Sequence, residues 1–182
     1  RKGGMISKLE DGFDRSHPLT LASLADAWLE RMEQRGYAAT TLNAQVWALK
    51  QFLQWTHERE LFVAEKITKP ILESYQAWLY RYRKEGSDEP LSIRTQRARL
   101  GALQRFFSHL CKTGVLMANP AADLELPRKP YHALPKVLNE DELRRLMGQP
   151  NITELLGIRD RAILETFYAT GMRRSEVVAL DL

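Results

Sequence analysis

The stretch Ala169-Thr-Gly-Met-Arg-Arg-Ser-Glu-Val-Val-Ala-Leu180 interrupts one helix-forming run and begins another. Gly171 can adopt the left-handed conformation that ends a helix. Arg173 then falls in the first turn of the next helix, beside backbone N–H groups that favour an anion. A planar guanidinium suits a phosphate, and Glu176 follows one turn later, close enough to hold Arg173 in one rotamer. From local physics alone, a helix–turn–helix corner with a surface arginine explains the same pattern.

The composition is that of an ordinary soluble globular chain of one or two domains, with 44% hydrophobic and 27% charged residues in 182. A net charge of +4 permits a nucleic-acid partner without requiring one. The single cysteine, Cys111, excludes an internal disulfide and fits a reducing compartment. No segment approaches the roughly 18–20 apolar residues of a membrane span, and Arg1–Met5 has no apolar run behind it as a signal peptide has. We expect a cytoplasmic protein.

Helical periodicity begins after an arm that lacks it. Residues 1–18 are expected to form this flexible arm. The first helix opens at Leu19-Thr20 and stops at Gly36, because apolar residues recur between them at three- and four-residue spacing. The second helix starts at Thr40 or Thr41, with Trp55 at the edge of its core stripe. Its outer face is polar but nearly uncharged and contains Thr40, Ala44, Trp47 and Gln51.

Two more amphipathic helices follow, and the second of them is strongly basic. They are predicted from about Lys69 to Gly86 and from Ser92 to Thr113. No acidic residue lies between positions 91 and 113. At 100° per residue, the side opposite the apolar stripe of the second helix carries Arg94, Gly101, Arg105 and Lys112, flanked by Arg97 and Arg99. This pattern is typical of a phosphate-backbone partner, although a solvated basic face accounts for it equally well.

The chain changes character between positions 114 and 139. Four prolines there predict an extended, stiff connection. A helix capped by Asn139 then runs to about Gly148, and another from Ile152 to Tyr168 is too apolar to stand exposed. With no strand pattern in the sequence, we predict an all-α chain. Its parts are an arm (1–18), a helical bundle (19–118), a linker (119–138) and the first part of a second domain (139–182).

Thr170-Gly-Met-Arg-Arg-Ser-Glu-Val177 resembles the first arginine motif of tyrosine site-specific recombinases, the phage-integrase and Xer-like family. That pattern runs Thr-Gly-hydrophobic-Arg-x-Ser-Glu-hydrophobic. The upstream chain is similar to the core-binding domain of this family, except that Gln45 stands where an aromatic residue is usual. Residues 134–138 are similar to the segment that opens the catalytic domain. The resemblance covers roughly residues 19–182.

This resemblance implies a fold and a reaction. The fold is a four-helix SAM-like core-binding bundle followed by the first helices of a mixed α+β catalytic domain. The reaction is DNA strand exchange through a 3′-phosphotyrosyl intermediate, without an external cofactor. Arg173 would stabilise charge on the phosphoryl oxygens, and Glu176 would position Arg173. The expected DNA contacts are Thr40, Thr41, Asn43, Arg94, Thr95, Arg97, Arg99, Arg105 and Lys112.

The remaining catalytic groups of the family follow the arginine motif and would lie beyond Leu182. They are a lysine on a β-hairpin, a His-x-x-Arg motif, a further His or Trp, and the nucleophilic tyrosine. None of the tyrosines here, including Tyr168, occupies the nucleophile's place. We therefore expect an inactive fragment that still binds DNA. No metal site is expected, because the four histidines lack ligand spacing and one cysteine cannot build a zinc site.

The expected partners are duplex DNA and other recombinase protomers, with no membrane. Apolar residues around Leu164 and Phe167 need a covering surface, so we also expect some self-association. Two alternatives stay open from the sequence. One is a stand-alone, non-catalytic DNA-binding regulator, and the other is a helical protein–protein adaptor that has no nucleic-acid partner.

Overall fold

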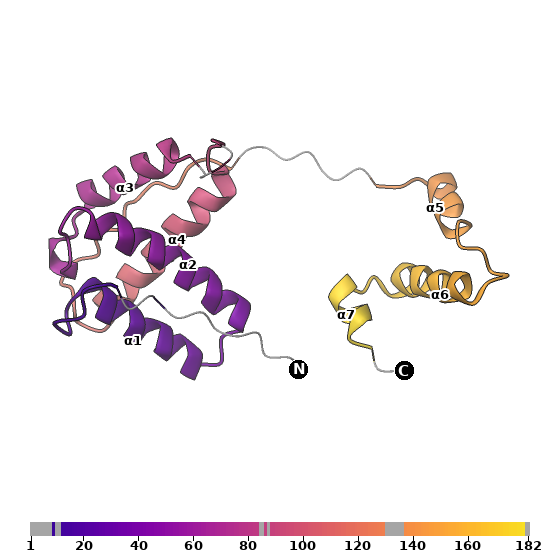
Figure 1. Ribbon diagram of the computed structural model, residues 1–182, viewed down its shortest axis with the longest axis horizontal. Helices are drawn as coiled ribbons and strands as arrows, with labels where there is room; N and C mark the ends of the chain where they lie inside the picture. The colour runs from indigo at the N-terminus through magenta and orange to yellow at the C-terminus, as the bar shows by residue number, and fades with distance from the viewer. Residues whose placement is uncertain (1–8, 10–11, 84–85, 87, 130–136, 181–182) are drawn as a thin grey trace. The chain divides into compact units, whose positions relative to one another are not determined.

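The computed structural model describes residues 9, 12–83, 86, 88–129 and 137–180. The chain divides into two compact units, Arg1–Tyr131 and His132–Leu182 (Figure 1). Over the described ranges every regular element is a helix, and β pairing is limited to two isolated bridges, Thr20 with Val63 and Arg83 with Pro90. The prediction of an all-α chain is confirmed for these residues.

The N-terminal unit is a four-helix bundle, as predicted. Helix α2 packs against α1 and α4, and α3 packs against α4. Two of the helices have side-chain caps, with the Thr20 hydroxyl accepting from the Ser23 N–H and Ser92 accepting from Thr95. The elements are α1 (Leu21–Gln34), α2 (Ala39–His57), the 3₁₀ helix η1 (Ala64–Lys66), α3 (Lys69–Arg81) and α4 (Ile93–Lys112).

An aromatic cluster joins α2, α3 and α4. The Phe52 ring meets Tyr75 edge-on at a centroid distance of 5.1 Å and Phe107 at 6.1 Å, and all three side chains are fully buried. Burial of each of the two phenylalanines stabilises the fold by about 1.5–3 kcal/mol. Trp55 was expected at the edge of the core stripe. It is instead buried, because Tyr75 packs against its ring at 5.3 Å.

Helix α3 ends at Arg81, earlier than the predicted end at Gly86. Tyr82 has an extended backbone with ψ 133°. The guanidinium of Arg83 donates to the backbone carbonyls of residues 80, 81 and 82, with the shortest N···O distance at 3.0 Å. A basic side chain that satisfies the last carbonyls of a helix stabilises its end, so the helix stops before the glycine.

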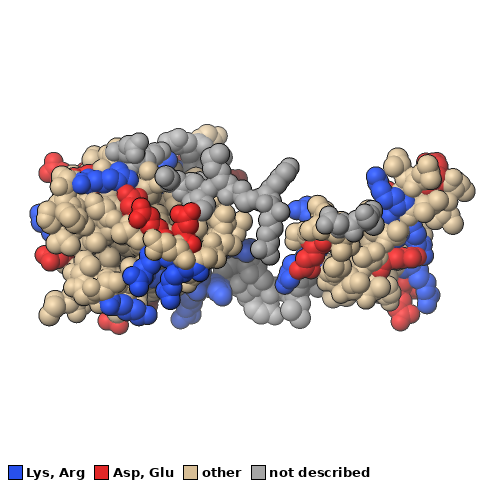
Figure 2. Space-filling view, turned by 90° about the horizontal axis from the view of Figure 1, so that it is seen from below, with Lys and Arg blue, Asp and Glu red and all other residues tan. Residues whose placement is uncertain are grey.

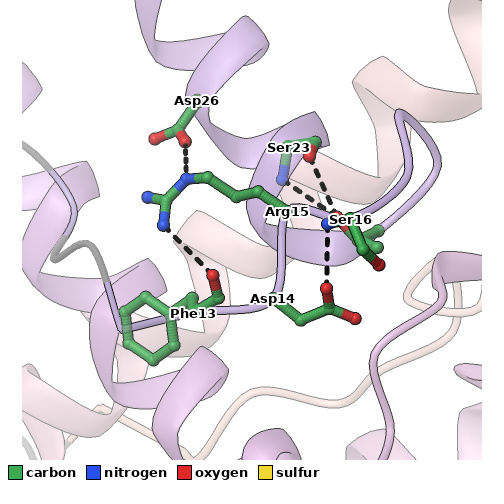
Figure 3. Close-up of polar contacts among 7 residues, drawn as sticks. Phe13, Asp14, Arg15, Ser16, Ser23 and Asp26 are labelled. Carbon is green, nitrogen blue, oxygen red and sulfur yellow. Dashed lines mark hydrogen bonds and ion pairs between the residues drawn. The ribbon is translucent and has the colours of Figure 1, made fainter.

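The segment before α1 is held against that helix (Figure 3). Arg15 Nε donates to Asp26 Oδ2 at 2.7 Å, and Arg15 Nη1 donates to the Phe13 carbonyl at 3.3 Å. Leu9 is buried in the core of the bundle. Within the predicted flexible arm, Phe13 and Arg15 thus have an apolar contact and an ion pair with the bundle, whereas residues 16–18 are exposed. Residues 1–8 and 10–11 lie outside the described part of the chain.

The first residues of the predicted linker (119–138) belong to the bundle in the structure. Leu116, Ala121 and Leu124 are buried in the bundle core. Side-chain amides of the helices satisfy the carbonyls of this extended segment, with Gln76 donating to Glu125 at 2.9 Å and Gln104 donating to Leu124 at 3.0 Å. The division between the two units falls after Tyr131. Residues 130–136 are not described.

The C-terminal unit contains α5 (Glu140–Met147), α6 (Leu155–Thr170) and α7 (Arg174–Val178). The predicted cap is confirmed as a capping box, in which Asn139 Oδ1 accepts from the Glu142 N–H and Glu142 accepts in return. Helix α6 starts at Leu155 rather than Ile152, because Asn151 Oδ1 accepts from the Thr153 N–H and forms a turn first.

The helices of this unit keep their apolar side chains accessible. Over residues 137–180 no residue is buried. Leu155 is 86% exposed, and Leu156, Ile158 and Val178 are also exposed. Leu164 and Phe167, around which the uncovered apolar surface was predicted, are half-buried, and the most exposed apolar side chains of these helices lie at the start of α6 and in α7.

Candidate DNA interface and arginine motif

The helix break in the arginine motif has the predicted form. Gly171 has φ 64° and ψ 16°, a left-handed conformation, and its N–H donates to the Phe167 carbonyl at 2.9 Å. Arg173 is the N-cap of α7 and has an extended backbone. It therefore stands just before the first turn of the new helix, one position earlier than expected.

Glu176 holds Arg173 at two points. The Glu176 carboxylate accepts from the Arg173 backbone N–H at 2.8 Å and from Arg173 Nη1 at 3.2 Å. The Arg173 side chain is 84% exposed, so most of its five N–H donors face solvent. The motif therefore presents an oriented guanidinium that can bind an oxyanion in a forked geometry.

Arg161 fixes the two longer helices of this unit to one another. Its Nη1 donates to the Met147 carbonyl at the end of α5, and its Nε donates to Glu165 at 2.7 Å within α6. Gly157 lies against the preceding turn, where an added Cβ would meet the Asn151 carbonyl oxygen at 1.8 Å. These contacts orient α6, and Gly171 and Arg173 follow directly at its C-terminal end.

The predicted DNA contacts fall into an exposed and a partly covered group. Thr40, Thr41, Arg94, Arg105 and Lys112 are exposed on α2 and α4, whereas Asn43, Thr95 and Arg97 are half-buried. Figure 2 shows Lys and Arg side chains gathered at one edge of the helical bundle, next to a group of acidic side chains. On the face shown, this edge carries the largest group of cationic side chains, and other Lys and Arg side chains lie apart from it.

Arg105 is oriented by a residue of the neighbouring helix. Its Nη2 donates to Gln45 Oε1 at 3.1 Å, and Gln45 is buried. In the family this position usually holds an aromatic residue. The bond to Arg105 explains how an amide is accommodated here, since a buried acceptor needs a donor. In the sequence, Gln45 stands out only as a departure from the family pattern. A polar residue on the core side of α2, facing a basic helix, was the signal for this pair.

Arg97 and Thr95 are engaged within the bundle. Arg97 Nη1 donates to the Pro127 carbonyl and ties α4 to the following extended segment. The Thr95 hydroxyl is 2.8 Å from the Ser92 hydroxyl, and its N–H donates to the same cap. Both side chains have structural partners, so they are less available to DNA than Arg94 and Arg105.

Arg99 needs a correction. The helical wheel placed it on the flank of the exposed face, but it is only 7% exposed. Its guanidinium carbon lies 5.8 Å from the Trp47 ring centroid and 6.0 Å from that of Tyr82. Rings from α2 and from the C-cap residue of α3 thus lie next to the buried guanidinium. The outward position predicted for Trp47 is confirmed, at 60% exposure.

Positive charge also surrounds the C-terminal end of α4. Partial burial, followed by the charges of Arg31, Arg35 and Lys112, lowers the pKa of His109 below its usual value. Arg31 belongs to α1, and Arg35 is its C-cap residue. The charge pattern of the sequence predicts a basic surface on α4 alone, because only tertiary packing brings these two arginines near His109.

No group of three or more potential metal ligands occurs among the described side chains. Across the same residues, no helix has both the length and the apolar character needed to cross a membrane.

Two family models match the chain in the regions just described. The phage integrase N-terminal SAM-like domain matches residues 24–115, which run from within α1 to just after α4 and make up about half of the chain. The phage integrase family model matches residues 136–182, including the arginine motif. The chain belongs to the phage integrase family of tyrosine recombinases.

Individual tyrosine recombinases can be aligned with most of this chain. The tyrosine recombinase XerC 2 of Ralstonia nicotianae is 34% identical over 164 residues, which cover 90% of this chain and 47% of that protein. The tyrosine recombinase XerD of Shewanella oneidensis is 32% identical over 166 residues, covering 91% and 51%. The chain thus spans about half the length of the curated relatives it matches.

A crystal structure supports the fold of the N-terminal unit. The N-terminal domain of a phage integrase/site-specific recombinase from Haloarcula marismortui matches with a TM-score of 0.51 and 21% identity. The match covers 60% of this recombinase chain and 97% of that domain. The predicted SAM-like core-binding bundle is confirmed.

Proposed function

We propose that this chain is the DNA-gripping part of a site-specific tyrosine recombinase, together with the first element of its phosphate-activating site. The observation that carries the proposal is the Arg173–Glu176 pair, in which one carboxylate fixes both the backbone and the side chain of an exposed arginine. The basic surface of the bundle supports it, because a recombinase must hold duplex DNA while a phosphodiester reacts.

In the proposed reaction a tyrosine hydroxyl attacks a DNA phosphodiester and forms a 3′-phosphotyrosyl link. The 5′-hydroxyl leaves, and a 5′-hydroxyl of the partner strand later reverses the step. Arg173 donates hydrogen bonds to the non-bridging phosphoryl oxygens as their charge grows, while Glu176 keeps the guanidinium oriented. Loss of one preorganised donor of this kind lowers the rate by about 10²–10³.

None of the six tyrosines of this chain holds the nucleophile's place in the family motif order. We therefore propose that the 182 residues bind DNA but do not cleave it by themselves. A covalent protein–DNA adduct formed by this chain on a nicked duplex would contradict this.

The bundle grips the duplex mainly through phosphates in this proposal. The proposed contacts are Thr40, Thr41, Asn43, Arg94, Thr95, Arg97, Arg105 and Lys112, with Arg94, Arg105 and Lys112 the most accessible cations. Phosphate contacts position a protein on DNA without reading its sequence. The partners are duplex DNA and other recombinase protomers, no external cofactor is needed, and the protein acts in the cytoplasm.

Arg105→Ala tests the assignment of the bundle surface. We expect it to weaken binding to all duplexes about equally and to reduce the slope of log affinity against log salt by about one. Lys66→Ala on η1, an exposed cation outside the proposed set, is the matched control and should leave the slope unchanged. Unchanged affinity in Arg105→Ala, or a loss confined to one DNA sequence, would contradict the assignment.

A further inference from the structure

Arg99 is the one buried charged residue among the described positions. Its Nη1 atom is inaccessible to solvent and has no hydrogen-bond partner. The hydroxyl of Tyr75 is likewise buried without a partner, and burial raises its pKa. The inner side of the α2–α3–α4 packing thus holds a permanent cation and an unpartnered hydroxyl close enough for the Arg99 charge to act on Tyr75.

A guanidinium in this state is energetically unfavourable. Taking a cation out of water costs free energy that is recovered only when an anion or several acceptors replace the water. Here the guanidinium lies next to the rings of Trp47 and Tyr82, and ring faces attract a cation weakly compared with a carboxylate or phosphate. An arginine cannot escape this cost by losing its proton.

The free-energy cost of burying Arg99 bears on DNA binding because Arg99 lies next to the proposed DNA surface. Trp47 lies on α2, on the outer face that also carries Thr40 and Ala44, and its exposed ring lies next to the guanidinium of Arg99. An exposed side chain can change rotamer rapidly. Arg105 lies further along α4, bonded to α2 through Gln45. Movement of the Trp47 ring would therefore expose the Arg99 guanidinium at the outer face of α2.

We propose that Arg99 is a gated phosphate-binding residue: a DNA backbone phosphate displaces the Trp47 ring and accepts a forked pair of hydrogen bonds from the guanidinium. The inference rests on the proposed function and adds to it a site that is closed in the free protein. A DNA phosphate fits better than an acidic protein side chain, because the accessible cations Arg94 and Arg105 on the same helix supply a positive field along a backbone path. The cost of the unpaired cation is relieved on binding.

Arg99→Met separates this role from a packing role. Methionine keeps most of the volume and removes the unpaired charge, so we expect the melting temperature to rise or stay level, which also shows that the variant folds. With a mixed-sequence duplex between about 50 and 200 mM salt, we expect the slope of log affinity to fall by about 0.9 and the affinity by about tenfold. Lys66→Met, which removes an exposed charge from η1, should change neither.

Trp47→Ala tests the gate. Removing the ring should raise the affinity for the duplex, and adding Arg99→Met should abolish that gain. Equal losses from Trp47→Ala with and without Arg99 would overturn the gate, because Trp47 would then contact DNA itself. An unchanged salt slope in Arg99→Met would overturn the phosphate site while leaving the proposed function standing. Failure of the wild-type chain to bind the duplex at about 50 mM salt would overturn both.

Discussion

Gln45 and Arg105 illustrate how a single polar position inside a helical bundle prepares a surface side chain. A buried amide oxygen must be paired, and here it is paired with a guanidinium whose other donors remain accessible. An arginine held in one rotamer loses less side-chain entropy when it binds a phosphate. The departure from the family's aromatic residue is therefore consistent with binding, at the expense of some apolar burial.

His109 makes the stability of the bundle depend on pH. Its pKa lies below the ordinary value of 6.5 because of partial burial and the charges of Arg31, Arg35 and Lys112. As the pH falls through about 6.5, the unfolded chain therefore takes up the proton first, and stability decreases. His109→Gln removes this linkage, so we expect the melting temperature to fall less between about pH 7.5 and 5.5.

Thermal unfolding of both proteins at the two pH values measures the effect. If the melting temperature falls equally in wild type and His109→Gln, protonation of His109 does not destabilise the folded protein, which would contradict the prediction.

Among the helices, α6 depends on one glycine at its start. A Cβ at Gly157 would overlap the Asn151 carbonyl oxygen at 1.8 Å, so Gly157→Ala must displace the turn that precedes the helix. Overpacking of this kind costs about 1–3 kcal/mol. We expect hydrogen exchange in the first turns of α6 to accelerate.

Gly101→Ala in α4 is the control for that measurement. The nearest atom to an added Cβ there is the flexible Arg105 Nη1 at 3.6 Å, and alanine is favoured over glycine in a helix by about 1 kcal/mol. The same substitution should therefore stabilise α4. Slower or unchanged exchange in α6 of Gly157→Ala would contradict the close contact.

Elements with local signals were predictable from the sequence, and those defined by packing were not. The capping side chain of Asn139 predicts a helix start, and the conformational freedom of Gly171 predicts a helix end. Both predictions agree with the structure. The surroundings of Arg99 and the hydrogen bond to the Leu124 carbonyl involve side chains far away in the chain, such as Trp47 and Gln104. Periodicity shows which face of a helix is apolar, but it does not show what will cover the opposite face.

At the scale of the whole molecule, the two units differ in how they are stabilised. The bundle has an aromatic core, whereas the described residues of the C-terminal unit leave large apolar side chains accessible. Apolar surface of this kind associates with another surface in water. We expect the 182-residue chain to self-associate as its concentration rises.

Light scattering of Leu155→Lys combined with Ile158→Lys measures this association, since both side chains are exposed on α6. The double variant should shift the chain toward monomer, and Glu154→Lys, which changes charge without removing apolar surface, should not. A wild-type chain that stays monodisperse and monomeric at high concentration would contradict the expectation.

Duplex-DNA binding by the 182-residue chain as a function of salt tests the central claim, which is that the bundle of this recombinase grips the phosphate backbone. The account predicts binding at about 50 mM salt and a steep linear fall of log affinity with log salt, because each neutralised phosphate releases a counterion. No binding at low salt, or an affinity independent of salt, would contradict it.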